Sequence, residues 1–150
     1  MERIIGKFFA LLLPCLIIFT VFVVVSRYVF GSGQAGVQEI ILYIHSLIFL
    51  GCAGWALLED EHVRVDIFYR NNTQKYKKII NLIGLLCFML PTIIIISIYS
   101  FDFILKSWAS LEGSTEPGGL PIKYIHKTFI LIFPISLMLA GFSLLRKLWK

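Results

Sequence analysis

The chain has 150 residues, of which 58% are hydrophobic and only 15% are charged, and its formal net charge is +5. A soluble domain carries about 25% charged residues, so a chain of this size and composition cannot cover itself with polar surface. The composition excludes a soluble globular protein and leaves no room for an enzyme active site in a cleft outside the membrane. We therefore expect a single all-α integral membrane domain over residues 1–150.

Apolar runs without any Asp, Glu, Lys or Arg make up about half of the chain, at residues 8–25, 40–58, 79–101 and 128–145. A bilayer core requires roughly 20 apolar residues per helix. The pattern predicts four transmembrane helices, spanning about residues 6–28, 38–59, 78–103 and 126–147. The first run is too long for a signal peptide and no small-residue cleavage site follows it, so we expect it to remain as the first span.

Proline and glycine predict different features in these spans. Pro14, Pro91 and Pro134 lie inside the first, third and fourth runs, where each removes a backbone hydrogen bond and favours a kink. The second run instead carries small residues, Gly51 and Gly54 among them, which allow another helix to approach closely. Glycine is also generally frequent in membrane helices, so both interpretations of the second run stand.

Basic residues indicate the orientation of the chain. Ten Lys and Arg residues lie in the N-terminal segment, the loop between spans two and three and the C-terminal segment, against four in the other two loops. Because basic residues are retained on the cytoplasmic side, the pattern predicts that both termini are cytoplasmic. The net positive charge is then a signal of topology and not of nucleic-acid binding.

Charged side chains are absent from the middle of every run. A carboxylate at that depth costs about 2.5–3.5 kcal/mol on insertion scales, and a proton-coupled pump or a small four-helix exporter would need one. A stand-alone exporter therefore remains only an alternative. Arg27 and Glu39 flank the first outer loop and can form an ion pair across it.

Cofactor and metal sites have little support in the sequence. His45 and His126 could ligate a haem between spans two and four, as in the membrane anchor of a respiratory enzyme, and this is the second alternative. A histidine near a helix end is more often hydrogen-bonded to a neighbour. Cys15, Cys52 and Cys87 all fall inside spans and are expected to pack rather than to form disulfides or a zinc site. We expect no catalytic residue, no metal ion and no cofactor in this chain.

Two loop segments have a distinctive sequence. After the second span, His62, Arg64 and Asp66 alternate with apolar residues, so one set can enter the interface or a partner while the other stays solvated. The segment can be a short interfacial helix or a solvated loop. Residues 110–121 on the outer side contain two prolines and three glycines, which favour a turn-rich docking surface or a rigid connector.

These segments carry a family resemblance that covers nearly the whole chain. The matching features are the Arg-Tyr-Val-Phe end of the first span (27–30), Glu39 at the start of the second, the segment from Gly51 to Ala56, the His-Val-Arg-Val-Asp segment (62–66) and the Glu-Pro-Gly-Gly-Leu-Pro turn (116–121) with Lys127 after it. In these features the chain resembles the small (Q-type, DctQ-like) membrane subunit of tripartite ATP-independent periplasmic (TRAP) transporters.

The resemblance implies a role that composition does not reveal. Such a subunit acts in the bacterial inner membrane with a large permease subunit, which holds the substrate and sodium sites, and with a periplasmic substrate-binding protein. Uptake, usually of an organic acid, is driven by a sodium gradient, and the small subunit supports the moving part of the large one as a scaffold. On this basis the candidate partner-contact residues are Arg27, Glu39, Gly51, Gly54, His62, Arg64, Asp66, Gly119, Leu120, Pro121 and Lys127.

Overall fold

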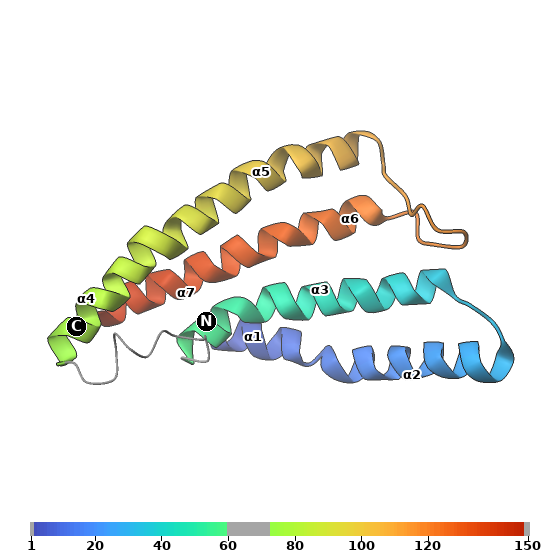
Figure 1. Ribbon diagram of the computed structural model, residues 1–150, viewed down its shortest axis with the longest axis horizontal. Coiled ribbons are helices and arrows are strands. Elements are labelled where there is room, and N and C mark those ends of the chain that lie inside the picture. Colours follow the sequence, from blue (N-terminus) through green and yellow to red (C-terminus); the bar gives the residue numbers. More distant parts are fainter. Residues whose placement is uncertain (1, 60–72, 149–150) are drawn as a thin grey trace.

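The computed structural model describes residues 2–59 and 73–148, and every regular element in these ranges is a helix. The helices form four spans (Figure 1). The first consists of α1 (Glu2–Ala10) and α2 (Leu13–Phe30), and the second is α3 (Ala35–Leu58). The third consists of α4 (Gln74–Ile83), η2 (Gly84–Met89) and α5 (Leu90–Ala109), and the fourth of α6 (Lys123–Thr128), η3 (Phe129–Leu131) and α7 (Ile132–Leu148). All four spans are long and apolar enough to cross a membrane. The prediction of an all-α protein with four transmembrane helices is therefore confirmed. The interfacial helix considered between the second and third spans lies outside the described residues.

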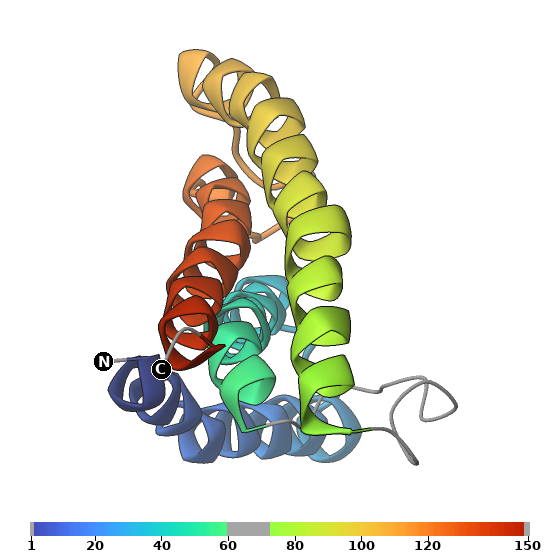
Figure 2. The same ribbon diagram turned by 90° about the vertical axis from the view of Figure 1, so that its left-hand side faces the viewer.

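The four spans form an open row rather than a closed bundle. The α1–α2 span packs mainly on α3, α3 packs on α7, and α7 packs on α5, so that the α1–α2 span and α5 lie at opposite edges of the row (Figure 2). Residues 31–34 and 110–122 connect the helices at one end of the molecule, which we call the hairpin end. The described N- and C-terminal ends both lie toward the other end, the C-terminal one farther along the long axis, and the helices spread apart toward the hairpin end (Figure 1).

Each proline of the apolar runs lies just after an irregular stretch of helix. Residues 11–12 form a turn between α1 and α2 two residues before Pro14, the π-helix η2 ends two residues before Pro91, and the 3₁₀-helix η3 ends three residues before Pro134. Proline has no N–H to donate, and its ring crowds the carbonyl four residues earlier. The helix therefore changes its hydrogen-bond spacing in the preceding turn, which is how π-bulges and 3₁₀ turns commonly arise in long helices.

The third span is longer than the predicted span 78–103. Its helix is continuous over 35 residues from Lys75 to Ala109, which corresponds to about 52 Å of length. A hydrocarbon core is about 30 Å thick, so this helix must tilt or project beyond the bilayer. The fourth span starts at Lys123, three residues before the predicted start.

Candidate functional site

At the hairpin end, a glutamate of α3 binds the loop that connects α5 to α6. Glu39 accepts a hydrogen bond from the Ser114 hydroxyl and another, 2.6 Å long, from the backbone N–H of Leu120. Both donors lie more than 70 residues away in the sequence, so these bonds join two different hairpins. No ion pair joins Glu39 to Arg27 in the described part of the chain, which differs from the pairing considered in the sequence, because Glu39 faces the 110–122 loop instead.

A second carboxylate, Glu112, belongs to this loop and binds the helices on both sides of it. Glu112 accepts a hydrogen bond of 2.8 Å from the Ser107 hydroxyl and one from the Lys127 ammonium, and the Lys123 ammonium lies 3.7 Å from it. The Lys127 ammonium also lies over the ring of Phe103, 4.1 Å from its centroid. Glu112 therefore links the end of α5 to the start of α6. We call the two carboxylates and their partners the hairpin clamp. It consists of Glu39, Glu112, Ser107, Ser114, Leu120, Lys123 and Lys127.

The loop backbone is ordered by its own hydrogen bonds. Ser114 N–H donates to the Leu120 carbonyl, and Gly119 N–H donates to the Glu116 carbonyl, both at 3.0 Å. Gly118 has a φ of 77°, a conformation that glycine adopts without strain. A Cβ at Gly119 would collide with the Ser114 hydroxyl and approach Glu39 to 2.9 Å. The turn-rich sequence thus builds a fixed path, in agreement with the rigid connector considered from the sequence.

The hairpin clamp should depend on pH in a defined direction. The hydrogen bond from Lys127, followed by that from Ser107, lowers the pKa of Glu112 below its ordinary value of 4.5. A carboxylate with a lowered folded-state pKa contributes stability above its unfolded pKa and loses it as the pH falls through the folded value. We therefore expect the clamp to be intact at neutral pH and at mildly acidic pH, and to weaken only below pH 4.5. Replacing Lys127 by glutamine should raise the pKa of Glu112, as measured by ¹³C-glutamate NMR.

Lys106 provides the control for this titration. It lies on α5 at the same end of the molecule, and no ion pair joins it to another described residue. Lys106→Gln should leave the Glu112 titration unchanged. An equal effect of the two substitutions would mean that general surface charge, and not the Lys127 contact, lowers the pKa of Glu112.

The two histidines considered as haem ligands have other partners. A hydrogen bond of 2.8 Å joins His126 Nε2 to the Ser46 hydroxyl, and the His126 ring stacks on Tyr43 with centroids 4.3 Å apart. His45 stacks on Phe49, with centroids 6.4 Å apart. Among the described residues, no group of three or more His, Cys, Asp or Glu side chains could bind a metal ion. The His126 contacts join α6 to α3, whereas His45 and Phe49 both lie on α3.

The glycines of α3 pack against helices of the same chain. A Cβ at Gly51 would overlap the ring of Phe9 in α1, and a Cβ at Gly54 would overlap the backbone carbonyl oxygen of Ser136 in α7. Both glycines are buried, and the Ser136 hydroxyl lies 3.1 Å from the Leu50 carbonyl to which it donates. The predicted close approach of another helix is therefore present, but it joins α3 to its own neighbours. Neither glycine is accessible to a second protein while these contacts exist.

The remaining candidate residues fall into two groups. Gly119, Leu120 and Lys127 lie in or against the hairpin clamp, with the exposed Pro121 beside them. The other group, His62, Arg64 and Asp66, lies outside the described residues. No motif in the sequence marks Glu112, Ser107 or Ser114 as a site residue. A hairpin between residues 107 and 127 would have suggested that Glu112 pairs with a lysine. The sequence around Ser114 does not indicate which carboxylate accepts the hydrogen bond from its hydroxyl.

Comparison with known proteins gives one match. The chain matches the model of a protein family described as "Tripartite ATP-independent periplasmic transporters, DctQ component" over residues 16–150. No curated protein and no solved structure shows significant similarity to it. The match includes the hairpin clamp, all of spans two to four and residues 16–30 of span one, but not α1.

Proposed function

Because the chain belongs to the DctQ family of tripartite ATP-independent periplasmic transporter components, we propose that it is the small permease subunit of a sodium-driven uptake system for organic acids. The family assignment carries this proposal. The family is one of transporter components rather than enzymes, and the four apolar spans suit a multi-pass membrane protein. The substrate and sodium sites would belong to a large permease subunit, and a periplasmic binding protein would deliver the substrate.

A scaffold role suits the residues that the spans contain. Their apolar runs carry no charged side chain that could bind an ion or an organic acid in mid-membrane. Contacts at Gly51 and Gly54 fix α3 against α1 and α7, while the hairpin clamp fixes the loop between α5 and α6. A rigid row of helices of this kind can support the large subunit while that subunit moves.

We propose that the hairpin end faces the periplasm and that both chain ends face the cytoplasm of a bacterial inner membrane. The excess of Lys and Arg on the opposite side of the spans supports this orientation. A cysteine in place of the exposed Glu116 should then react with a membrane-impermeant maleimide added outside spheroplasts. Protection until the membrane is permeabilised would reverse the assignment.

Reconstitution tests the transport function. We expect the chain to copurify with a large permease subunit encoded beside it. Liposomes containing both subunits should accumulate an organic acid only when a sodium gradient and the cognate binding protein are present. Omitting the small subunit should abolish uptake. Sodium-independent uptake, or full uptake by the large subunit alone, would contradict the proposal.

The same assay tests the predicted role of the segment after α3. Replacing Arg64 or Asp66 by alanine is expected to lower both copurification and uptake, because these charges would contact the large subunit or the lipid interface. Lys75→Ala, on the same side of the spans, serves as the control. If both loop variants assemble and transport normally, the segment is a solvated loop.

A further inference from the structure

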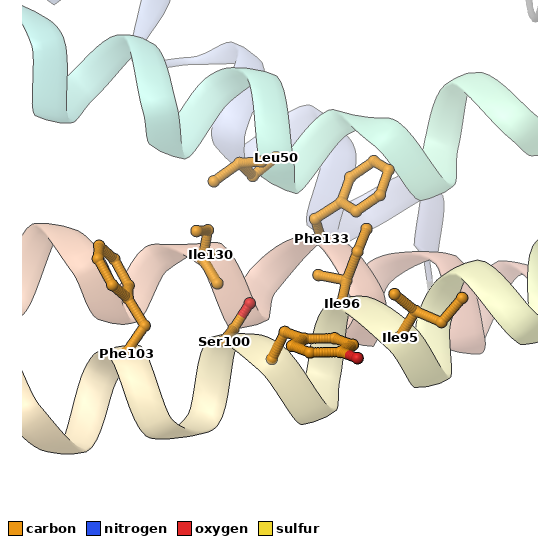
Figure 3. Close-up of a pocket in the computed structure, with 8 residues that line it drawn as sticks. Leu50, Ile95, Ile96, Ser100, Phe103, Ile130 and Phe133 are labelled. Atoms are coloured by element: carbon orange, nitrogen blue, oxygen red, sulfur yellow. The ribbon is translucent and has the colours of Figure 1, made fainter.

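An apolar groove opens between α3 and α5, with η3 and α7 as its floor (Figure 3). It has a volume of about 650 Å³, and its surface is almost entirely apolar. The groove exists because α3 and α5 both flank α7 in the open row without packing closely on each other. The side chains that shape it are Leu50, Ile96, Ser100, Phe103, Ile130 and Phe133.

The groove lies at the depth of one leaflet. Phe103 is six residues from the end of α5 at Ala109, and Ile95 is fourteen residues from it. At 1.5 Å per helical residue, the groove extends from about 9 Å to about 21 Å below the hairpin end. The charge-free run of this helix ends at Phe101, eight residues or about 12 Å from Ala109, so the hydrocarbon core begins near the upper end of the groove. One leaflet of a core about 30 Å thick extends about 15 Å from there, and the groove therefore lies at the depth of its acyl chains.

The walls of the groove do not suit a second helix. Helices associate in lipid through small residues that let their backbones approach. In this chain those residues, such as Gly51, Gly54 and Gly141, face neighbouring helices of the same chain. The groove is lined instead by bulky aliphatic and aromatic side chains, with Ser100 as its one small residue. Walls of this kind fit a thin, flexible chain of methylenes better than a helix backbone.

Polar groups lie above the upper end of the groove. The Lys127 ammonium lies over Phe103, which itself lines the groove. Trp108 donates from its indole to the Thr128 hydroxyl at 2.9 Å and contacts the Tyr124 ring edge-on. Aromatic residues in such positions mark the level of lipid headgroups. The Lys127 ammonium, which donates to Glu112, has two further N–H donors for a phosphate at that level.

Charge at the hairpin end indicates which headgroup would be favoured. Its four cationic side chains are balanced by four anionic ones: Arg27, Lys106, Lys123 and Lys127 against Glu39, Asp102, Glu112 and Glu116. An anionic lipid therefore gains no net attraction there, whereas a headgroup with one positive and one negative charge can complement both kinds of side chain.

We propose that this groove binds one acyl chain of a zwitterionic phospholipid from the leaflet at the hairpin end, with its phosphate near Lys123 and Lys127. The lipid fills the space between α3 and α5 and so completes the row of helices. This inference requires only that the chain spans a bilayer. It can fail while the transport proposal stands, and the reverse also holds.

Native mass spectrometry of the purified, delipidated full chain tests the site. Phosphatidylethanolamine and phosphatidylglycerol with identical acyl chains are added separately. We expect one phosphatidylethanolamine to be retained in preference to phosphatidylglycerol. Ile96→Trp, which fills the groove, should weaken this retention about tenfold, since excluding even two methylenes from an apolar site has an effect of that size. Ile98→Trp is the matched control, because Ile98 lies on the same helix, is 63% exposed and does not line the groove.

Several results would overturn the proposal. They are an absence of retained lipid in the unmodified chain, an equal loss in the two tryptophan variants, or a preference for phosphatidylglycerol. If Ile96→Trp fails to fold, as judged by circular dichroism, Leu50→Trp fills the groove from the opposite wall and should give the same loss. A photoreactive residue at position 96 that crosslinks to the large subunit and not to lipid would show that a partner helix occupies the groove instead.

Discussion

Replacing Gly54 by alanine is expected to lower the free energy of unfolding of the membrane domain by about 3 kcal/mol, at the upper end of typical overpacking effects. The added Cβ would overlap the Ser136 carbonyl oxygen, and a backbone atom inside a helix cannot move aside alone. The α3 and α7 helices would have to separate, which also breaks the hydrogen bond from the Ser136 hydroxyl to Leu50. Unfolding by sodium dodecyl sulfate in mixed micelles, followed by circular dichroism, measures the change.

Gly141 provides a control with the same chemical change. A Cβ there would also overlap a neighbouring atom, but that atom is the terminal methyl of Met89, which can rotate away because methionine is flexible. Gly141→Ala should therefore stay within about 1 kcal/mol of the unmodified chain, since the helix propensity that alanine gains offsets a small repacking cost. Equal stabilities of the two variants would show that the α3–α7 contact is not as close as the structure has it.

Replacing Glu39 by alanine is expected to release the 110–122 loop from α3. The substitution removes the acceptor for both the Ser114 hydroxyl and the Leu120 N–H. A hydrogen bond to a charged group contributes about 2 kcal/mol, so the Leu120 amide should exchange with deuterium about 30-fold faster. Hydrogen-exchange mass spectrometry of the purified chain provides the measurement.

Glu116 is the matched control for this experiment. It is an exposed glutamate of the same loop, and its side chain has no hydrogen bond or ion pair with another described residue. Glu116→Ala should leave the exchange of the Leu120 amide unchanged. If Glu39→Ala also leaves it unchanged, the loop is ordered by its own backbone and by Glu112 alone.

The transmembrane spans were predictable because a bilayer imposes simple requirements of length and polarity. Four apolar runs predict four helices wherever they pack, and the prolines predict where these helices become irregular. The length of the third helix was harder to predict from the sequence. Asp102 and Lys106 lie within the helix, which continues past the predicted end of the span at residue 103 to Ala109. Charged side chains near a helix end can reach the interface without ending the helix, so charge limits the apolar segment and not the helix.

Contacts between residues far apart in the chain could not be predicted from the local sequence. Arg27 lies twelve residues from Glu39 and carries the opposite charge, yet Glu39 binds Ser114 and Leu120, which are 75 and 81 residues away. The choice depends on how the second hairpin folds over α3. The glycines of α3 show the same limit. Their small size predicted a close approach of another helix, but only the tertiary structure shows that α1 and α7 of the same chain make it.

The spread of the helices toward the hairpin end (Figure 1) also concerns the membrane around them. The protein occupies more lateral area in one leaflet than in the other, so it is shaped like a wedge. Lipids of the leaflet at the hairpin end are displaced more than those opposite, and the stress is relieved if the bilayer bulges toward that side. We therefore expect the isolated chain to favour a bilayer that curves in this sense, and a partner that occupies the narrow end to remove the asymmetry.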